Sequence, residues 1–216
     1  MCGRYGYTNK DNERIKKLFR LKKIDFDLVP RYNIIPGQNV PVILNESPKE
    51  LTQAKWGLVP FWAKDEKIGY KMINARAETI FEKPSFRNAI KKKRCLILAD
   101  YFFEWKRTEK QKQPFCIKLK THETFAFAGI WETWQDKLIS CSIITTAPNK
   151  LMEKIHDRMP VILPKGKEEE WLNETDMETV KKLLTSYKAA DMETYEVSTL
   201  VNSPANNSPE ILIPVQ

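Results

Sequence analysis

The sequence predicts an α+β fold, a single domain spanning residues 1–216 and built on a mainly antiparallel, curled β-sheet or open barrel with peripheral helices. Three observations lead to this fold class. A chain of 216 residues with 42% hydrophobic residues, including six Trp, seven Tyr and ten Phe, can bury one substantial core. No internal repeat or long linker divides it. Segments of strand type outnumber helical ones and do not alternate regularly with them, which favours antiparallel pairing.

The first helix is expected to begin at a cap on Thr8 or Asn9 and to run through about residue 21, because Ile15, Leu18 and Phe19 form an apolar stripe. Prolines then interrupt residues 30–41, and that stretch ends in a short strand. Runs of apolar, β-branched and aromatic residues predict further strands at 55–58, 95–99, 102–106, 115–119, 125–131, 140–146, 160–163 and 194–197. Helices are expected at 77–91, 167–172 and 176–186. The tail is expected to wrap around the domain, with residues 211–215 buried.

Composition narrows the class of protein. No apolar stretch reaches the roughly 20 residues of a membrane helix, and charges near the start argue against a signal peptide, so we expect a cytoplasmic protein. The net charge of +8 suits a polyanionic partner. Cys95, Cys116 and Cys141 lie in apolar runs and are expected to be core residues. With two His and no CxxC spacing, neither a metal site nor a cofactor is expected.

A run of four cations, residues 91–94, directly precedes a strand that is expected to be buried. It can be read as a row of phosphate ligands or as an ordinary helix end and turn, and the sequence leaves both interpretations open.

Cys2 follows the initiator methionine directly. If Met1 is removed, Cys2 carries a thiol and an α-amine on neighbouring carbons, with ordinary pKa values of about 8.5 and 7.7 to 8.0. An aldehyde can form an imine with the amine and then be attacked by the sulfur, which closes a five-membered thiazolidine. The second attack is intramolecular and has a high effective molarity. The alternative is that position 2 simply tolerates a small residue.

Two residues could move protons for such a reaction. His156 lies in IHDRMP and has the side chain best suited to proton transfer near neutral pH. Glu104 lies in DYFFEWK, where alternation puts it on one face with Phe102 while Phe103 and Trp105 lie on the other. Burial would raise the pKa of Glu104 and make it a usable acid and base. The pattern does not decide whether Glu104 points inward, and a lone His is commonly structural.

Polar and cationic side chains elsewhere could complete a site. Asn74 and Arg76, in MINARAET, are expected where a strand passes into a helix, so Asn74 is either a helix cap or a partner of the terminal amine. Arg76 can bind phosphate with two hydrogen bonds. Arg4 is close enough in sequence to Cys2 to favour the thiolate and to attract phosphate.

Aromatic residues could stack on unpaired bases. In KWGLVPFWAKDEK we expect Trp56 to be buried and Trp62, beside charged residues, to be the stacking residue. Asn33 and Pro36, in RYNIIPG, are expected to shape the same DNA-binding groove.

The segments MCGRY, RYNIIPG, WGLVPFW, INARAET, FEWK, IHDRMPVIL and NSPEIL occur in this order from end to end. In this the chain resembles the SOS-response-associated peptidase family, the abasic-site processing proteins. The resemblance implies capture of abasic sites in single-stranded DNA through Cys2, with Asn74 positioning its amine and with Glu104 and His156 handling protons. It also implies removal of the chain's own Met1, reversal of the crosslink, and phosphate binding by Arg4, Arg76 and Arg158.

The resemblance further implies a place in the DNA damage response, at the nucleoid. Capture of one lesion by one chain requires no partner subunit, so we expect a monomer without an obligate protein partner. Where some relatives carry paired tryptophans, this chain has 61–63 as Phe-Trp-Ala, which leaves the stacking ring open. Two other functions remain. An N-terminal-nucleophile amidohydrolase would turn over an amide without DNA. A non-covalent single-strand-binding module would be indifferent to Cys2→Ala.

Overall fold

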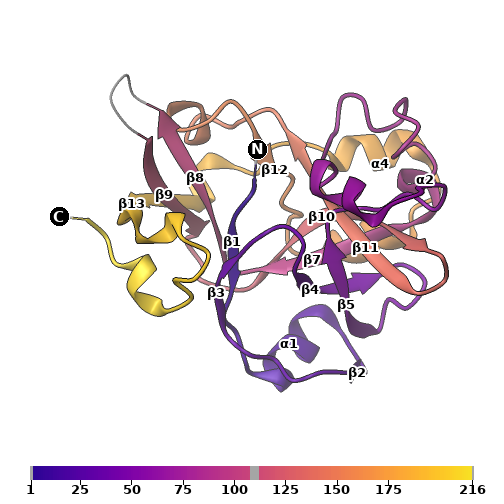
Figure 1. The fold of residues 1–216 in the computed structure, drawn as a ribbon, viewed down its shortest axis with the longest axis horizontal. Coiled ribbons are helices and arrows are strands. Elements are labelled where there is room, and N and C mark those ends of the chain that lie inside the picture. Colours follow the sequence, from indigo (N-terminus) through magenta and orange to yellow (C-terminus); the bar gives the residue numbers. More distant parts are fainter. Residues whose placement is uncertain (1, 108–111, 216) are drawn as a thin grey trace.

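A five-stranded antiparallel sheet forms one side of the molecule. The computed structural model of the chain describes residues 2–107 and 112–215. The strand order is β13-β9-β8-β1-β3. The bounds are β1 (Tyr5–Tyr7), β3 (Arg31–Ile34), β8 (Tyr101–Arg107), β9 (Lys112–Leu119) and β13 (Met192–Glu196). Figure 1 places this sheet on the left of the molecule, with its strand β1 near the middle of the view.

The second sheet closes on itself. Its ring consists of β4 (Asn39–Leu44), β5 (Glu50–Trp56), β7 (Arg94–Ala99), β10 (Phe125–Trp134) and β11 (Leu138–Thr146). Four of the ring pairings are antiparallel, and the parallel pairing of β11 with β5 closes it. Three short strands extend the sheet: β2 (Lys23–Ile24), β6 (Asn74–Arg76) and β12 (Met159–Pro160). The expected mainly antiparallel, curled sheet is therefore confirmed, and the barrel is closed where the sequence suggested an open one.

The helices are short and cover the outside of the barrel. They are α1 (Asn12–Phe19), α2 (Ala89–Lys92), α3 (Glu168–Asn173) and α4 (Met177–Leu183). Asp11 caps α1 by accepting a hydrogen bond from the Arg14 N–H at 3.0 Å. Arg94 is buried between α2 and α3, where its guanidinium donates to the carbonyl oxygens of Trp171 at 2.6 Å and Ile90 at 3.0 Å. Within the described ranges no helix is long and apolar enough to cross a membrane.

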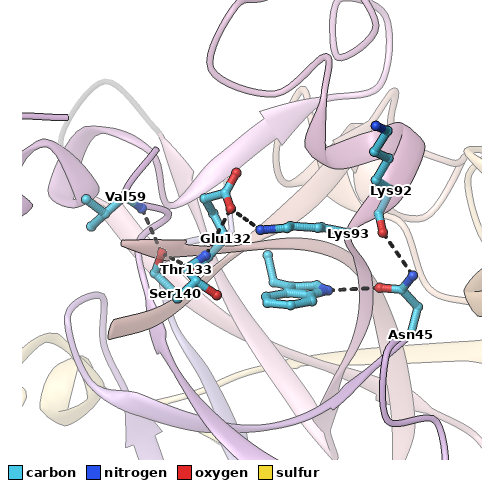
Figure 2. Close-up of polar contacts among 8 residues, drawn as sticks. Asn45, Val59, Lys92, Lys93, Glu132, Thr133 and Ser140 are labelled. Atoms are coloured by element: carbon cyan, nitrogen blue, oxygen red, sulfur yellow. Dashed lines mark hydrogen bonds and ion pairs between the residues drawn. The ribbon is translucent and has the colours of Figure 1, made fainter. Parts of the chain in front are cut away.

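The cationic run 91–94 turns out to be a helix end. Figure 2 shows Lys93 directed at the carboxylate of Glu132, with which it forms an ion pair. The Lys93 ammonium also lies 5.0 Å from the ring centroid of Trp131. Asn45 accepts a hydrogen bond from the Trp131 indole and donates one to the carbonyl of Lys92, both at 3.0 Å. Because Lys93 and Arg94 are committed to these contacts, the four cations do not form a continuous row of phosphate ligands.

The expected helix at 77–91 is wrong over most of its length. Residues 77–88 form consecutive turns and only α2 is helical. Pro84 explains the difference, since it lacks an N–H and disfavours helical backbone at the preceding residue. The strand expected at 55–58 instead ends at Trp56, because Gly57 adopts a φ of 127° and its backbone packs against the carbonyl of Gly69.

The C-terminal segment, residues 198–214, packs on the outer face of the five-stranded sheet (Figure 1, yellow). Val201 and Ile211 contribute to a small apolar cluster there with Tyr101 and Phe103. The expectation that all of 211–215 is buried is wrong: Ile211 is 1% exposed, but the Ile213 and Val215 side chains are more than half exposed, at 61% and 51%. This end runs along the edge of β13, where its backbone pairs with Glu196 and Val197.

Candidate functional site

An open pocket of about 710 Å³ lies where the start of the chain meets β8, the end of β6 and the loop before β12. Of the described residues that line it, five are cationic and two are carboxylates: Arg4, Arg76, Arg107, Lys112 and Arg158 against Glu104 and Asp157. A pocket with this charge attracts an anionic ligand. The rest of its lining includes His156 and Trp105.

Strand pairing brings these distant residues together. The N–H of Phe103 donates to the carbonyl of Arg4 at 2.9 Å, so the segment that contains Cys2 continues the antiparallel pairing of β1 with β8. β11 pairs with β6 on one side and with β12 on the other, and therefore places Asn74 and the loop 155–158 at the same end of the barrel.

Cys2 lies beneath the pocket and is fully buried. Its carbonyl oxygen accepts a hydrogen bond from Asn74 Nδ2 at 2.8 Å. The Asn74 Oδ1 atom is buried and has no hydrogen-bond partner among the described residues. Burial raises the pKa of the Cys2 thiol well above its ordinary value, and the negative charge of Glu104 raises it further. The thiol is therefore protonated near neutral pH.

Glu104 points inward, on the same face of β8 as Phe102, and is 3% exposed. Burial raises its pKa from an ordinary 4.5 to about 7. Its Oε2 atom lies 3.9 Å from His156 Nε2. A carboxyl group with a pKa near the working pH can both accept and return a proton.

His156 is held in the neutral form by its surroundings. Burial lowers its pKa, so the uncharged ring predominates near pH 7. In this form Nδ1 accepts a hydrogen bond from the Arg158 N–H at 3.0 Å, which leaves the ring proton on Nε2, the nitrogen that faces Glu104. Asp157 Oδ1 lies 2.9 Å from Nδ1 and would pair with the ring if Nδ1 were protonated.

The guanidinium of Arg4 is held by groups other than the Cys2 sulfur. Its Nη1 atom donates to Asn33 Oδ1 and to the Val201 carbonyl, both at 2.9 Å, and its guanidinium lies 5.9 Å from the Trp105 ring centroid. Arg4 therefore does not have the expected effect on the Cys2 thiol, whose pKa is raised by burial. It lines the wall of the pocket instead.

Asn33 is 3% exposed and holds Arg4 in place through the hydrogen bond that its Oδ1 atom accepts. Its amide nitrogen donates to the carbonyls of Val201, Ser203 and Asn206 at 2.8 to 3.2 Å. Because these contacts use the whole side chain, Asn33 supports Arg4 in the wall of the pocket.

Arg76 and Arg158 both line the pocket, but they differ in exposure and in their contacts. Arg76 is exposed at the end of β6. Arg158 forms a two-fold ion pair with Glu78, with Nη1 to Oε1 at 2.6 Å and Nη2 to Oε2 at 2.9 Å. Glu78, like Trp105 and Asn202, was not recognised from the sequence, although it lies inside the INARAET segment.

Outside the pocket, Trp62 is exposed and Trp56 is buried, both as expected. Trp62 is 50% exposed, Trp56 is fully buried, and Phe61 beside Trp62 is 59% exposed. Pro36 is half-buried in the turn that leads to Gly37, over which the ring of Tyr70 packs.

The described residues contain no group of three or more His, Cys, Asp or Glu side chains that could hold a metal ion. The pocket has a buried thiol beneath it, two side chains able to exchange protons near neutral pH in its lining, and an excess of positive charge. This combination suits covalent chemistry on an anionic substrate with an electrophilic carbon.

Comparisons with known proteins agree on one family. A family model described as SOS response associated peptidase (SRAP) matches residues 1–204. The chain is 52% identical to the abasic site processing protein YoqW of Bacillus subtilis, with 98% of this chain and 99% of that protein covered. It is 33% identical to the abasic site processing protein HMCES of Xenopus tropicalis, covering 85% of this chain and 65% of that protein. An X-ray structure of a protein from Bacteroides thetaiotaomicron superposes with a TM-score of 0.90 at 32% identity, with both chains covered completely.

Proposed function

Because the chain belongs to the SOS response associated peptidase (SRAP) family, we propose that it processes abasic sites in DNA by capturing them covalently through Cys2. The single observation that carries the proposal is the position of Cys2, which lies under a cationic pocket, bonded to Asn74 and close to the charge of Glu104. The relatives named abasic site processing proteins support the same substrate.

The reaction begins with hydrolysis of the peptide bond between Met1 and Cys2, which consumes one water and leaves the Cys2 amine free. The ring-opened sugar of an abasic site presents an aldehyde. The amine adds to the aldehyde carbon and water leaves, which gives an imine. The sulfur then adds to the imine carbon, and the thiol proton ends on the nitrogen. The product is a thiazolidine, and the capture step releases one water in total.

Glu104 is the proton carrier in this proposal. A protonated thiol is a weak nucleophile, so the thiol needs a base at the moment of attack. Glu104, with a pKa of about 7, is partly ionised at neutral pH and can take that proton. The same carboxyl group can activate water for removal of Met1 and donate a proton when the crosslink reverses. His156, with Nε2 at 3.9 Å from Glu104, can pass protons between Glu104 and the pocket.

Asn74 holds the reacting residue in place. Its amide nitrogen fixes the Cys2 carbonyl, and its buried Oδ1 atom offers an acceptor to the amine that Met1 removal creates. Both contacts restrict the amine to one orientation, which increases the effective molarity of the reaction.

The DNA is held by charge and by stacking. Arg4, Arg76 and Arg158 are proposed to contact backbone phosphates, and Trp62 to stack on an unpaired base of single-stranded DNA. This mode of binding reads no sequence, so the aldehyde decides where the protein remains. One chain supplies every proposed group, so we propose that it acts as a monomer.

The decisive experiment uses an oligonucleotide with one abasic site and the same oligonucleotide after borohydride reduction of its aldehyde to an alcohol. The expected result is a product that survives denaturing electrophoresis with the first and not with the second. Cys2→Ser and Cys2→Ala should abolish it. Mass spectrometry should find Cys2 at the N-terminus of the reactive protein.

Three results would contradict the proposal. Retention of Met1 in all molecules of a crosslinking preparation would exclude the thiazolidine. Turnover of glutamine without DNA would favour an N-terminal-nucleophile amidohydrolase. DNA binding without any covalent product, unchanged by Cys2→Ala, would leave a non-covalent single-strand-binding module.

A further inference from the structure

We infer that Glu78 occupies the place of a DNA phosphate on Arg158 and must give way when DNA binds, so that it sets how strongly the protein discriminates against undamaged DNA. This inference rests on the function proposed above and concerns a residue that is outside the proposed reaction. Glu78 follows β6 in the chain, and its ion pair with Arg158 joins two segments 80 residues apart.

The pairing uses the face of Arg158 that a phosphate would use. Two guanidinium nitrogens, Nη1 and Nη2, bind the two carboxylate oxygens of Glu78 at 2.6 and 2.9 Å. This two-fold geometry is the one that arginine adopts with phosphate. A carboxylate that fills it is a direct competitor of a backbone phosphate.

The other donors of Arg158 do not offer an equivalent place. Nη2 also donates to the Thr145 carbonyl at 2.6 Å, so both of its N–H groups are used. Nε is buried and has no partner among the described residues. The remaining N–H groups, on Nε and Nη1, point from opposite edges of the guanidinium. A phosphate can therefore make two adjacent hydrogen bonds to Arg158 only if Glu78 moves.

Exposure shows which partner can move. The Arg158 side chain is 12% exposed and anchored to Thr145, whereas the Glu78 side chain is 50% exposed. Glu78 can swing into solvent at little cost, while Arg158 stays in the pocket wall. The hydrogen bond from Arg158 also lowers the pKa of Glu78, so Glu78 is ionised at neutral pH.

As a consequence, every DNA molecule that enters the pocket binds with a free-energy penalty. Each must displace one carboxylate before Arg158 is available. An abasic site recovers this penalty through the covalent bond, and undamaged single-stranded DNA does not. Glu78 therefore lowers the non-specific affinity more than the final yield of captured lesion.

The test measures binding of an undamaged single-stranded oligonucleotide at several salt concentrations by fluorescence anisotropy. Glu78→Gln keeps the size of the side chain and removes its charge. We expect Glu78→Gln to bind up to about 5-fold more tightly at low salt, the range that an exposed ion pair covers at 1.4 kcal/mol per tenfold. The slope of log K against log salt should steepen by up to about 0.7, the value for one phosphate contact on a single strand, because in the wild-type protein that contact replaces the ion pair with Glu78 and in the variant it is a net gain.

The matched control is Glu82→Gln. It makes the same charge change four positions after Glu78, at an exposed residue that does not line the pocket. It should leave the salt slope unchanged. An equal effect of both variants would reduce Glu78 to a long-range charge and overturn the inference.

A second comparison separates competition from support. If Glu78 only positions Arg158, Glu78→Gln should weaken binding and flatten the slope in the same way as Arg158→Gln, and the inference is then wrong. Circular dichroism and the pH 7 urea midpoint establish that each variant is folded. Failure of the proposed function is seen separately, as absence of a covalent product with the wild-type protein and the abasic oligonucleotide.

Discussion

Replacing Glu104 with Gln is expected to make the fold more stable at alkaline pH while it impairs the chemistry. Glu104 is 3% exposed, and burial raises its pKa from an ordinary 4.5 to about 7. Each pKa unit corresponds to about 1.36 kcal/mol. Ionisation of this buried carboxyl in the folded protein therefore lowers the free energy of unfolding by about 3 kcal/mol. Gln has a similar shape and cannot ionise, so it avoids this cost.

The pH window follows from the direction of the shift. Between pH 4.5 and about 7 the folded protein holds the Glu104 proton more tightly than the unfolded chain does. The free energy of unfolding of the wild-type protein therefore decreases as the pH rises through this window. Below pH 4.5 the carboxyl is protonated in both states, and the variant has no electrostatic advantage. Above pH 7 the advantage of Gln reaches its full value.

The assay is urea unfolding of wild type, Glu104→Gln and the exposed control Glu82→Gln at five pH values from 4.5 to 8.5. The difference between Glu104→Gln and wild type should grow by about 3 kcal/mol from the lowest to the highest pH, which corresponds to a rise of about 6 to 12 °C in relative melting temperature for a chain of this size. The control should show no such growth. A difference that stays constant with pH would refute the reasoning, because it would mean that Glu104 does not titrate near neutrality.

The remaining predictions concern three other positions. Asn33→Ala should lower the free energy of unfolding by about 1 to 3 kcal/mol in urea, since it removes one of the two acceptors of Arg4 Nη1 and the amide donor of three carbonyls; an unchanged midpoint would contradict this. Trp62→Ala should weaken binding of single-stranded oligonucleotides by about 1 to 3 kcal/mol in anisotropy measurements without altering the urea midpoint, because its ring is exposed. His156→Ala should slow both formation and reversal of the crosslink in quenched time courses; unchanged rates would show that His156 is structural.

The part of the fold that the sequence could predict is the part that local patterns encode. The strands β7 to β11 are long runs of apolar, β-branched and aromatic residues, and each was expected within a few residues of its observed position. Closure of the barrel could not be predicted, because it depends on a parallel pairing between β5 and β11 from distant parts of the chain. The segment 77–88 has helical composition, yet Pro84 and its packing against neighbours favour turns.

The candidate site also has a part that the sequence could predict and a part that it could not. The residue types and the family resemblance predicted Cys2, Asn74, Glu104 and His156 as site residues. The inward direction of Glu104 was open, because both faces of β8 carry large apolar residues: Phe102 packs in the main core and Phe103 in the smaller cluster under the C-terminal segment. Partners that lie far apart in sequence could not be found from spacing, and the bond between Arg158 and Glu78 is of this kind.

Burial explains why the pocket combines an inert thiol with an active base. The same exclusion of water that raises the pKa of Cys2 keeps it protonated, and a protonated, buried thiol reacts slowly with oxidants and alkylating agents. That exclusion also brings the pKa of Glu104 close to 7, where it can remove the thiol proton on demand. A thiolate activated in advance by a neighbouring cation would react with any electrophile that entered the pocket. In the proposed reaction, a thiol that depends on Glu104 reacts when an aldehyde has already bound the neighbouring amine, and the energetic cost of burying a carboxyl would provide selectivity for the lesion.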